Sequence, residues 1–142
     1  MKKSNYILVV IVAMMMVAGC NFNTNRDQSK KAVETSKEMP DLTRGVDKVL
    51  TSLEDLSTVV KQSPNETKKI QSSGEQLAEN WDEIEKRVEE AFPEDYKNIE
   101  ESLYPLISEA KKETPNVQKI KPLMTDTKKK ITEFKEKLEI ST

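Results

Sequence analysis

The chain contains no histidine and a single cysteine, Cys20, among its 142 residues. Without histidine there is no Ser-His or Cys-His nucleophile pair, and a lone cysteine cannot form a disulfide within the chain. Aromatic residues make up only 5% of the sequence and there are three glycines, whereas charged residues make up 34%. This balance predicts helices with narrow buried seams, and it argues against an enzyme with a deep catalytic site.

An excess of one charge sign is also missing. The 23 Lys and Arg residues are balanced by 25 Asp and Glu residues, which gives a formal net charge of −2. The chain therefore has neither the basic footprint of a nucleic-acid-binding domain nor a long acidic tail. We expect no nucleic-acid partner.

The N-terminus contains the three parts of a secretory signal. Lys2 and Lys3 form a cationic head, an apolar run covers residues 6–18, and small residues precede Cys20. The run is shorter than the roughly 20 apolar residues that span a bilayer comfortably. We expect residues 1–19 to be removed, and the alternatives are a signal peptide with a chance cysteine or an uncleaved N-terminal anchor.

The end of this segment, Val17-Ala18-Gly19-Cys20, resembles the lipobox of bacterial lipoproteins. The resemblance implies that a signal peptidase recognises Val17, Ala18 and Gly19, and that Cys20 becomes the first residue of the mature chain with a diacylglyceryl thioether. Two or three acyl chains, such as palmitate, anchor a protein stably, at about 0.8 kcal/mol per buried methylene. The expected location is the extracytoplasmic face of the cell membrane. The Lys-, Asn- and Ile-rich composition favours a Gram-positive envelope, and a Gram-negative outer membrane stays open.

The remaining chain divides into two predicted parts. Residues 20–40 are expected to be the lipidated N-terminus and a flexible tether, because residues 21–28 are polar and Asn-rich with no apolar period. Residues 30–39 predict at most one or two frayed helical turns. Residues 41–142 are expected to form a helical domain.

In that domain apolar residues recur at steps of four and three, the period of an amphipathic helix. The pattern predicts helices over residues 41–62, 66–91, 93–110 and 114–138, with Pro105 and Pro122 as kinks. Thr114 is the predicted N-cap of the last helix, and Ser73 with Gln76 forms a capping box if the second helix starts there. The predicted seam positions are Leu42, Val46, Val49, Leu53, Leu56, Val60, Ile70, Gly74, Leu77, Trp81, Ile84, Val88, Ala91, Tyr96, Ile99, Leu103, Leu106, Ala110, Val117, Ile120, Met124, Thr127, Ile131, Phe134 and Leu138.

These segments and their short connectors predict an all-α fold, an antiparallel bundle of about four helices. Gly74 in the seam indicates either a close approach of another backbone or a break in the helix. A longer helical hairpin or coiled coil that pairs with another chain is the alternative architecture.

Charge is unevenly placed along the predicted helices. Residues 75–101 hold eleven acids, whereas residues 111–137 hold nine lysines. The favoured interpretation is that the second and third helices attract the fourth inside one bundle. A second interpretation is that the lysine-rich helix faces an anionic lipid or wall polymer, worth about 1 kcal/mol per lysine near a charged surface.

Three acids on one predicted helical face are candidate metal ligands, although a metal site is not the favoured interpretation. Asp82, Glu85 and Glu89 share one predicted helical face, and their oxygens suit hard cations such as calcium, magnesium or ferric iron. Acids on a helix are more often a solvated face, so we expect no resident metal and no cofactor.

The aromatic segment of residues 81–106 is the most distinctive stretch after the lipobox. Trp81-Asp82-Glu83-Ile84-Glu85, Phe92-Pro93-Glu94-Asp95-Tyr96, Ile99-Glu100 and Leu103-Tyr104-Pro105-Leu106 resemble the helical extracytoplasmic modules of bacterial iron uptake, the imelysin-like and iron-permease-linked proteins. The histidine-containing metal motif of imelysin-like proteins is absent, so no ligands are carried over. Trp81, Tyr96 and Tyr104 are candidate partner-binding residues, with a place in the core as the favoured alternative.

Together these observations predict a lipid-anchored, non-enzymatic binding or scaffolding module. We expect it to contact the membrane through Cys20 and to bind an envelope protein or a second copy of itself. The alternative function is an accessory solute- or metal-binding component of an uptake system.

Overall fold

The computed structural model of the chain describes residues 26–141, with side chains from residue 41 onward. It contains five helices in this range: α1 (Arg26–Gln62), α2 (Thr67–Asp82), α3 (Glu85–Ala91), α4 (Pro93–Ala110) and α5 (Val117–Ile140). No strand is present in the described residues, so the all-α prediction is confirmed. The lipobox and the predicted signal peptide lie outside this range.

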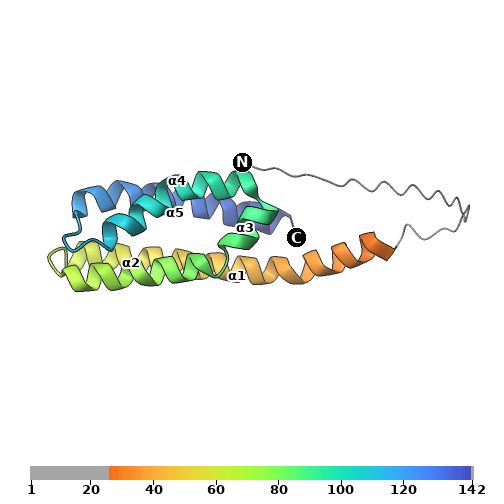
Figure 1. The fold of residues 1–142 in the computed structure, drawn as a ribbon, viewed down its shortest axis with the longest axis horizontal. Helices are drawn as coiled ribbons and strands as arrows, with labels where there is room; N and C mark the ends of the chain where they lie inside the picture. The colour runs from red at the N-terminus through yellow and green to blue at the C-terminus, as the bar shows by residue number, and fades with distance from the viewer. Residues whose placement is uncertain (1–25, 142) are drawn as a thin grey trace, which may run out of the picture.

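The four longer helices form a closed bundle (Figure 1). Helices α1 and α2 make one layer, α4 and α5 make the other, and the short α3 joins the two layers at one end. Around the bundle α1 packs against α2, α2 against α4, α4 against α5, and α5 against α1. The predicted bundle of about four helices is therefore present, with α3 as an additional short element.

The core consists almost entirely of the predicted seam positions. Of these, all but Ala91, Tyr96 and Val117 are buried. Tyr96 and Val117 are half-buried, and Ala91 is exposed at the last residue of α3. The prediction that Ala91 belongs to the seam is wrong, because α3 ends at this residue and its buried face stops at Val88.

The second predicted helix is divided at Glu83 and Ile84. Helix α2 starts at Thr67 and ends at Asp82, so the capping box at Ser73 does not form. The Ile84 N–H bonds to the Trp81 carbonyl at 2.9 Å, a tighter turn than that of an α-helix, and α3 starts one residue later. Ile84 is nevertheless buried, because its side chain packs where α1 has Gly45 and no Cβ.

Gly74 marks a close approach between helices. It is buried in the middle of α2, where a Cβ would lie 2.7 Å from the Cβ of Ala110 in α4. The absent side chain lets α2 and α4 pack closely. The alternative interpretation of Gly74 as a break in the helix is wrong.

The last helix starts later than predicted. Its N-cap is Asn116, whose Oδ1 accepts hydrogen bonds from the N–H groups of Gln118 (3.0 Å) and Lys119 (3.3 Å). The prediction of Thr114 as N-cap is wrong, because Thr114 lies in the connection before the helix. Pro105 and Pro122 both lie inside helices, and neither divides its helix.

Helix α1 begins at Arg26, within the segment that the sequence predicts as a tether. Residues 26–40 are thus helical, and the division of the chain at residue 40 stays a prediction. Across the described residues, none of the helices has the length and apolarity needed to cross a bilayer.

Candidate functional site

The structure brings Trp81, Tyr96 and Tyr104 together at the junction of α2, α3 and α4, and adds two acids to them. We call Trp81, Glu85, Tyr96, Glu100 and Tyr104 the tyrosine–carboxylate cluster. The rings of Trp81 and Tyr96 stack with centroids 6.4 Å apart and an interplanar angle of 11°. The Tyr104 hydroxyl donates a hydrogen bond of 2.9 Å to Glu85 Oε2. Residues of three helices therefore meet in one polar and aromatic group.

Helix geometry explains how α4 supplies most of this cluster. Tyr96, Glu100 and Tyr104 are spaced by four residues, so they lie one above the other on the same face of α4. The break after Asp82 starts α3 at Glu85 and leaves that residue within reach of the Tyr104 hydroxyl.

Both tyrosine hydroxyls are held in the protonated form. Burial raises the pKa of Tyr104 well above its ordinary value, and the neighbouring Glu100, Tyr96 and Glu85 raise it further. The Glu100 carboxylate is the main cause of the raised pKa of Tyr96. A phenol beside a carboxylate keeps its proton because ionisation would place two negative charges together. The cluster therefore presents O–H donors beside carboxylate acceptors at neutral pH.

Two polar atoms in this cluster are buried without a hydrogen-bond partner. They are Trp81 Nε1 and Glu100 Oε1. Neither Glu85 nor Glu100 forms an ion pair with a lysine or arginine of the described residues. The cluster thus combines two buried polar atoms that lack a partner with two acids that lack an ion pair, and buried polar atoms without a partner are uncommon in folded proteins.

The three sequence-predicted residues differ in accessibility. Trp81 is fully buried, Tyr96 is half-buried, and Tyr104 is 41% exposed. Trp81 is therefore a core residue that supports the cluster, and Tyr104 is the residue that a partner can contact. Glu85 and Glu100 were missed as partners of the tyrosines, although the four-residue spacing of Glu100 from both tyrosines indicated a shared face.

The acids considered as metal ligands do not form a site of their own. Asp82 ends α2, whereas Glu85 and Glu89 belong to α3. Within the part of the chain that the structure describes, no group of three or more histidine, cysteine or acidic side chains is arranged to hold a metal ion.

The lysine-rich helix α5 forms ion pairs on both of its flanks. Lys130 and Lys137 pair with Glu101 and Asp95 of α4. Lys128 and Lys135 pair with Glu54 and Asp47 of α1. The predicted attraction between the third and fourth predicted helices is therefore present.

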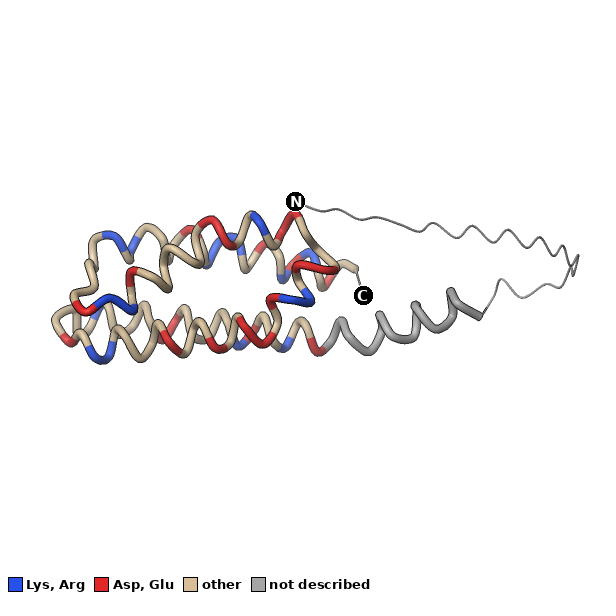
Figure 2. Tube along the Cα trace, in the orientation of Figure 1, with Lys and Arg blue, Asp and Glu red and all other residues tan. Residues whose placement is uncertain are grey.

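The attraction predicted for the second helix takes a different form. Helix α2 packs against α1 and α4, and among the described residues the acids spread along α2 and α3 (Figure 2) form no ion pair with α5. Glu83, between α2 and α3, pairs instead with Lys48 of α1 at 2.7 Å. The position of α2 diagonally across the bundle from α5 explains the difference.

The fold and this cluster define a small helical-bundle protein with an acidic and aromatic surface site. Over 109 residues the chain is 30% identical to the iron uptake system component EfeM of Bacillus subtilis (strain 168). The match covers 76% of this chain and 28% of EfeM, so the chain spans less than a third of that relative's length. No protein-family model and no solved structure matches the chain. The similarity supports the predicted resemblance to iron-uptake modules, and the lipobox stays a prediction.

Proposed function

We propose that the chain is an accessory, non-enzymatic binding component of an uptake system, held at the extracytoplasmic face of the cell membrane by lipid on Cys20. The similarity to a component of an iron uptake system supports the link to uptake. The lipobox-like sequence at Val17 to Cys20 supports the anchor.

The tyrosine–carboxylate cluster is the observation that carries the binding role. Tyr104 is exposed beside the Glu85 and Glu100 carboxylates, which have no cationic partner in the described chain. An aromatic face next to carboxylates suits a lysine or arginine side chain, which gains both a charged hydrogen bond and a cation–π contact. The partner is therefore an envelope protein that presents a basic side chain to the α2–α4 face.

Site-specific photo-crosslinking in cells tests this proposal without altering the cluster. A photoreactive amino acid replaces Asp82, which is exposed at the end of α2 next to Trp81. The matched control replaces Asp55, an exposed aspartate of α1. We expect a discrete adduct with one envelope protein from position 82 and not from position 55.

A second substitution links the adduct to the cluster. Combining the position 82 probe with Tyr104→Ala should lower the adduct yield several-fold, whereas Thr51→Ala on α1 should leave it unchanged. The proposal fails if both probe positions give the same species, or if position 82 gives none.

The alternative function is direct binding of a cation by the same cluster, favoured by its carboxylate and phenol oxygens, which are hard donors. Trp81 is the single tryptophan of the chain and lies within the cluster, so its fluorescence reports on occupancy. Saturable quenching by ferric citrate that disappears in Glu85→Gln/Glu100→Gln, and persists in Glu75→Gln/Glu79→Gln, would favour this alternative over a protein partner.

A further inference from the structure

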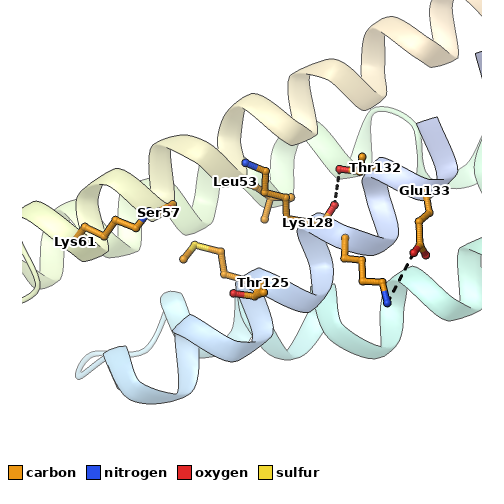
Figure 3. Close-up of a pocket in the computed structure, with 9 residues that line it drawn as sticks. Leu53, Ser57, Lys61, Thr125, Lys128, Thr132 and Glu133 are labelled. Carbon is orange, nitrogen blue, oxygen red and sulfur yellow. Dashed lines mark hydrogen bonds and ion pairs between the residues drawn. The ribbon is translucent and has the colours of Figure 1, made fainter. Parts of the chain in front are cut away.

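A groove lies between α1 and α5, away from the tyrosine–carboxylate cluster. Its volume is about 460 Å³, within the range of small-molecule sites. Leu53 and Met124 supply apolar lining, and the remaining lining residues are polar or charged: Ser57, Lys61, Thr125, Lys128, Lys129, Thr132 and Glu133. In Figure 3, Ser57 and Lys61 approach the groove from α1, across from Thr125 of α5.

Charged residues of α1 and α5 along this groove pair at regular intervals of seven residues. Asp47 pairs with Lys135 at 2.7 Å, and Glu54 pairs with Lys128 at 3.0 Å. Seven residues separate the two acids along α1, and seven residues separate the two lysines in the reverse direction along α5. Because antiparallel helices keep this register over neighbouring turns, the next level places Lys61 opposite Lys121.

The first two positions therefore pair an acid of α1 with a lysine of α5, whereas the third, at one end of the groove, places two lysines opposite each other. Neither Lys61 nor Lys121 forms an ion pair among the described residues, whereas Lys128 has Glu54 and Lys129 lies 3.8 Å from Glu133. Two like charges at one level repel each other unless an anion lies between them. Among the lysines that line the groove, Lys61 is thus the one without an ion pair in the described chain, and the register places Lys121 next to it at the end of the groove.

We propose that this end of the groove binds the phosphate group of a phosphate ester between Lys61 and Lys121. A phosphate oxyanion offers several acceptors, and lysine ammonium groups bind it as point charges from either side. The Ser57 hydroxyl forms no hydrogen bond in the described chain and is free to donate to a phosphate oxygen. Leu53 and Met124 can contact the carbon part of the ester.

This phosphate site is independent of the proposed uptake function, because it lies on a different face and selects the opposite charge. The ester can be a free small molecule or the headgroup of an anionic phospholipid, since both present the same phosphate. The groove is partly open to solvent, so a headgroup attached to a larger molecule can also enter it.

Titrations of the full chain in a nonionic detergent, followed by the amide NMR shifts of residues 57–61 and 121–125, test the proposal. The probes are sn-glycerol 3-phosphate and dihexanoyl phosphatidylglycerol, with dihexanoylglycerol, which carries no phosphate, as the control lipid. Saturable shifts with glycerol phosphate identify a free ester as the source. Shifts with phosphatidylglycerol alone identify a lipid headgroup, and either result supports the site.

Two double variants separate a built site from general electrostatics. Lys61→Gln/Lys121→Gln should weaken binding at least about ten-fold. Lys68→Gln/Lys97→Gln removes the same charge from exposed lysines on α2 and α4 and should leave affinity unchanged. The proposal is overturned if both double variants weaken binding equally, if the two lipids bind equally, or if no probe binds the wild type.

Discussion

Glu109 is a nearly buried acid in the last turn of α4, with 7% of its surface exposed. One carboxylate oxygen accepts a hydrogen bond of 2.6 Å from Lys112, and the other accepts one of 3.1 Å from the Asn116 N–H. The side chain therefore joins the end of α4 to the residue that caps α5. Periodicity gave no indication of this role, because an acid at the edge of a seam is usually solvated.

The pKa of Glu109 predicts a pH-dependent contribution to stability. The hydrogen bond from Lys112 is the main cause that lowers this pKa, and the Asn116 N–H lowers it further. The unfolded chain keeps an ordinary glutamate pKa of about 4.3, so it binds the proton at higher pH than the folded chain does. The contribution is fully present above the ordinary glutamate pKa of about 4.3 and is lost as the pH falls through the lower pKa of the folded chain.

We expect Glu109→Gln to lower the free energy of unfolding by about 1–2 kcal/mol at pH 7. The difference from wild type should shrink as the pH falls toward 3, as measured by urea unfolding. Glu113→Gln, which removes the same charge from an exposed residue of the neighbouring connection, is the control. A difference that stays constant with pH would contradict the assignment of this titration to Glu109.

At the scale of the elements, the start of α5 differs between the sequence prediction and the structure. Thr114 followed by Pro115 has the composition of an N-cap with proline at the first helical position. The structure instead uses Asn116, because Glu109 binds the Asn116 N–H and so fixes the chain at that residue. A tertiary contact decides between two local signals of similar strength.

Substitution of the two candidate caps gives a direct comparison. Asn116→Ala removes the acceptor for two N–H groups and should destabilise the fold by about 1 kcal/mol. Thr114→Ala should change the free energy of unfolding by only a few tenths of that amount. Thermal or urea unfolding of both variants provides the measurement, and the reverse order would restore Thr114 as the cap.

Most of the fold could be predicted from the sequence, because its seams follow one helical period. The division of the second predicted helix could not, since Leu77, Trp81, Ile84 and Val88 keep that period through the break. The break depends on a tertiary contact, the packing of Ile84 against Gly45 of α1. Trp81, Tyr96 and Tyr104 could be selected by their type and Glu100 by its four-residue spacing from both tyrosines, whereas the role of Glu85 depended on where α3 begins.

At the scale of the whole molecule, the predicted lipid anchor would hold both the tyrosine–carboxylate cluster and the groove between α1 and α5 next to the membrane. Intact mass and membrane fractionation of the wild type beside Cys20→Ala test it. We expect the wild type to start at Cys20, to carry diacylglyceryl mass and to sediment with membranes. We expect the variant to lack that mass. An unmodified and freely soluble wild type would remove the lipobox prediction and the location that depends on it.

The order of helices around the bundle places the two proposed sites on different sides of the molecule. The tyrosine–carboxylate cluster lies where α2 and α3 meet α4, and the lysine-bearing groove lies between α1 and α5. Occupancy of one site leaves the other uncovered, so a basic partner and a phosphate ester would not compete for space. Each copy of the chain would then act as an adaptor with a stoichiometry of one ligand per side, and saturation with either ligand would leave the capacity for the other unchanged.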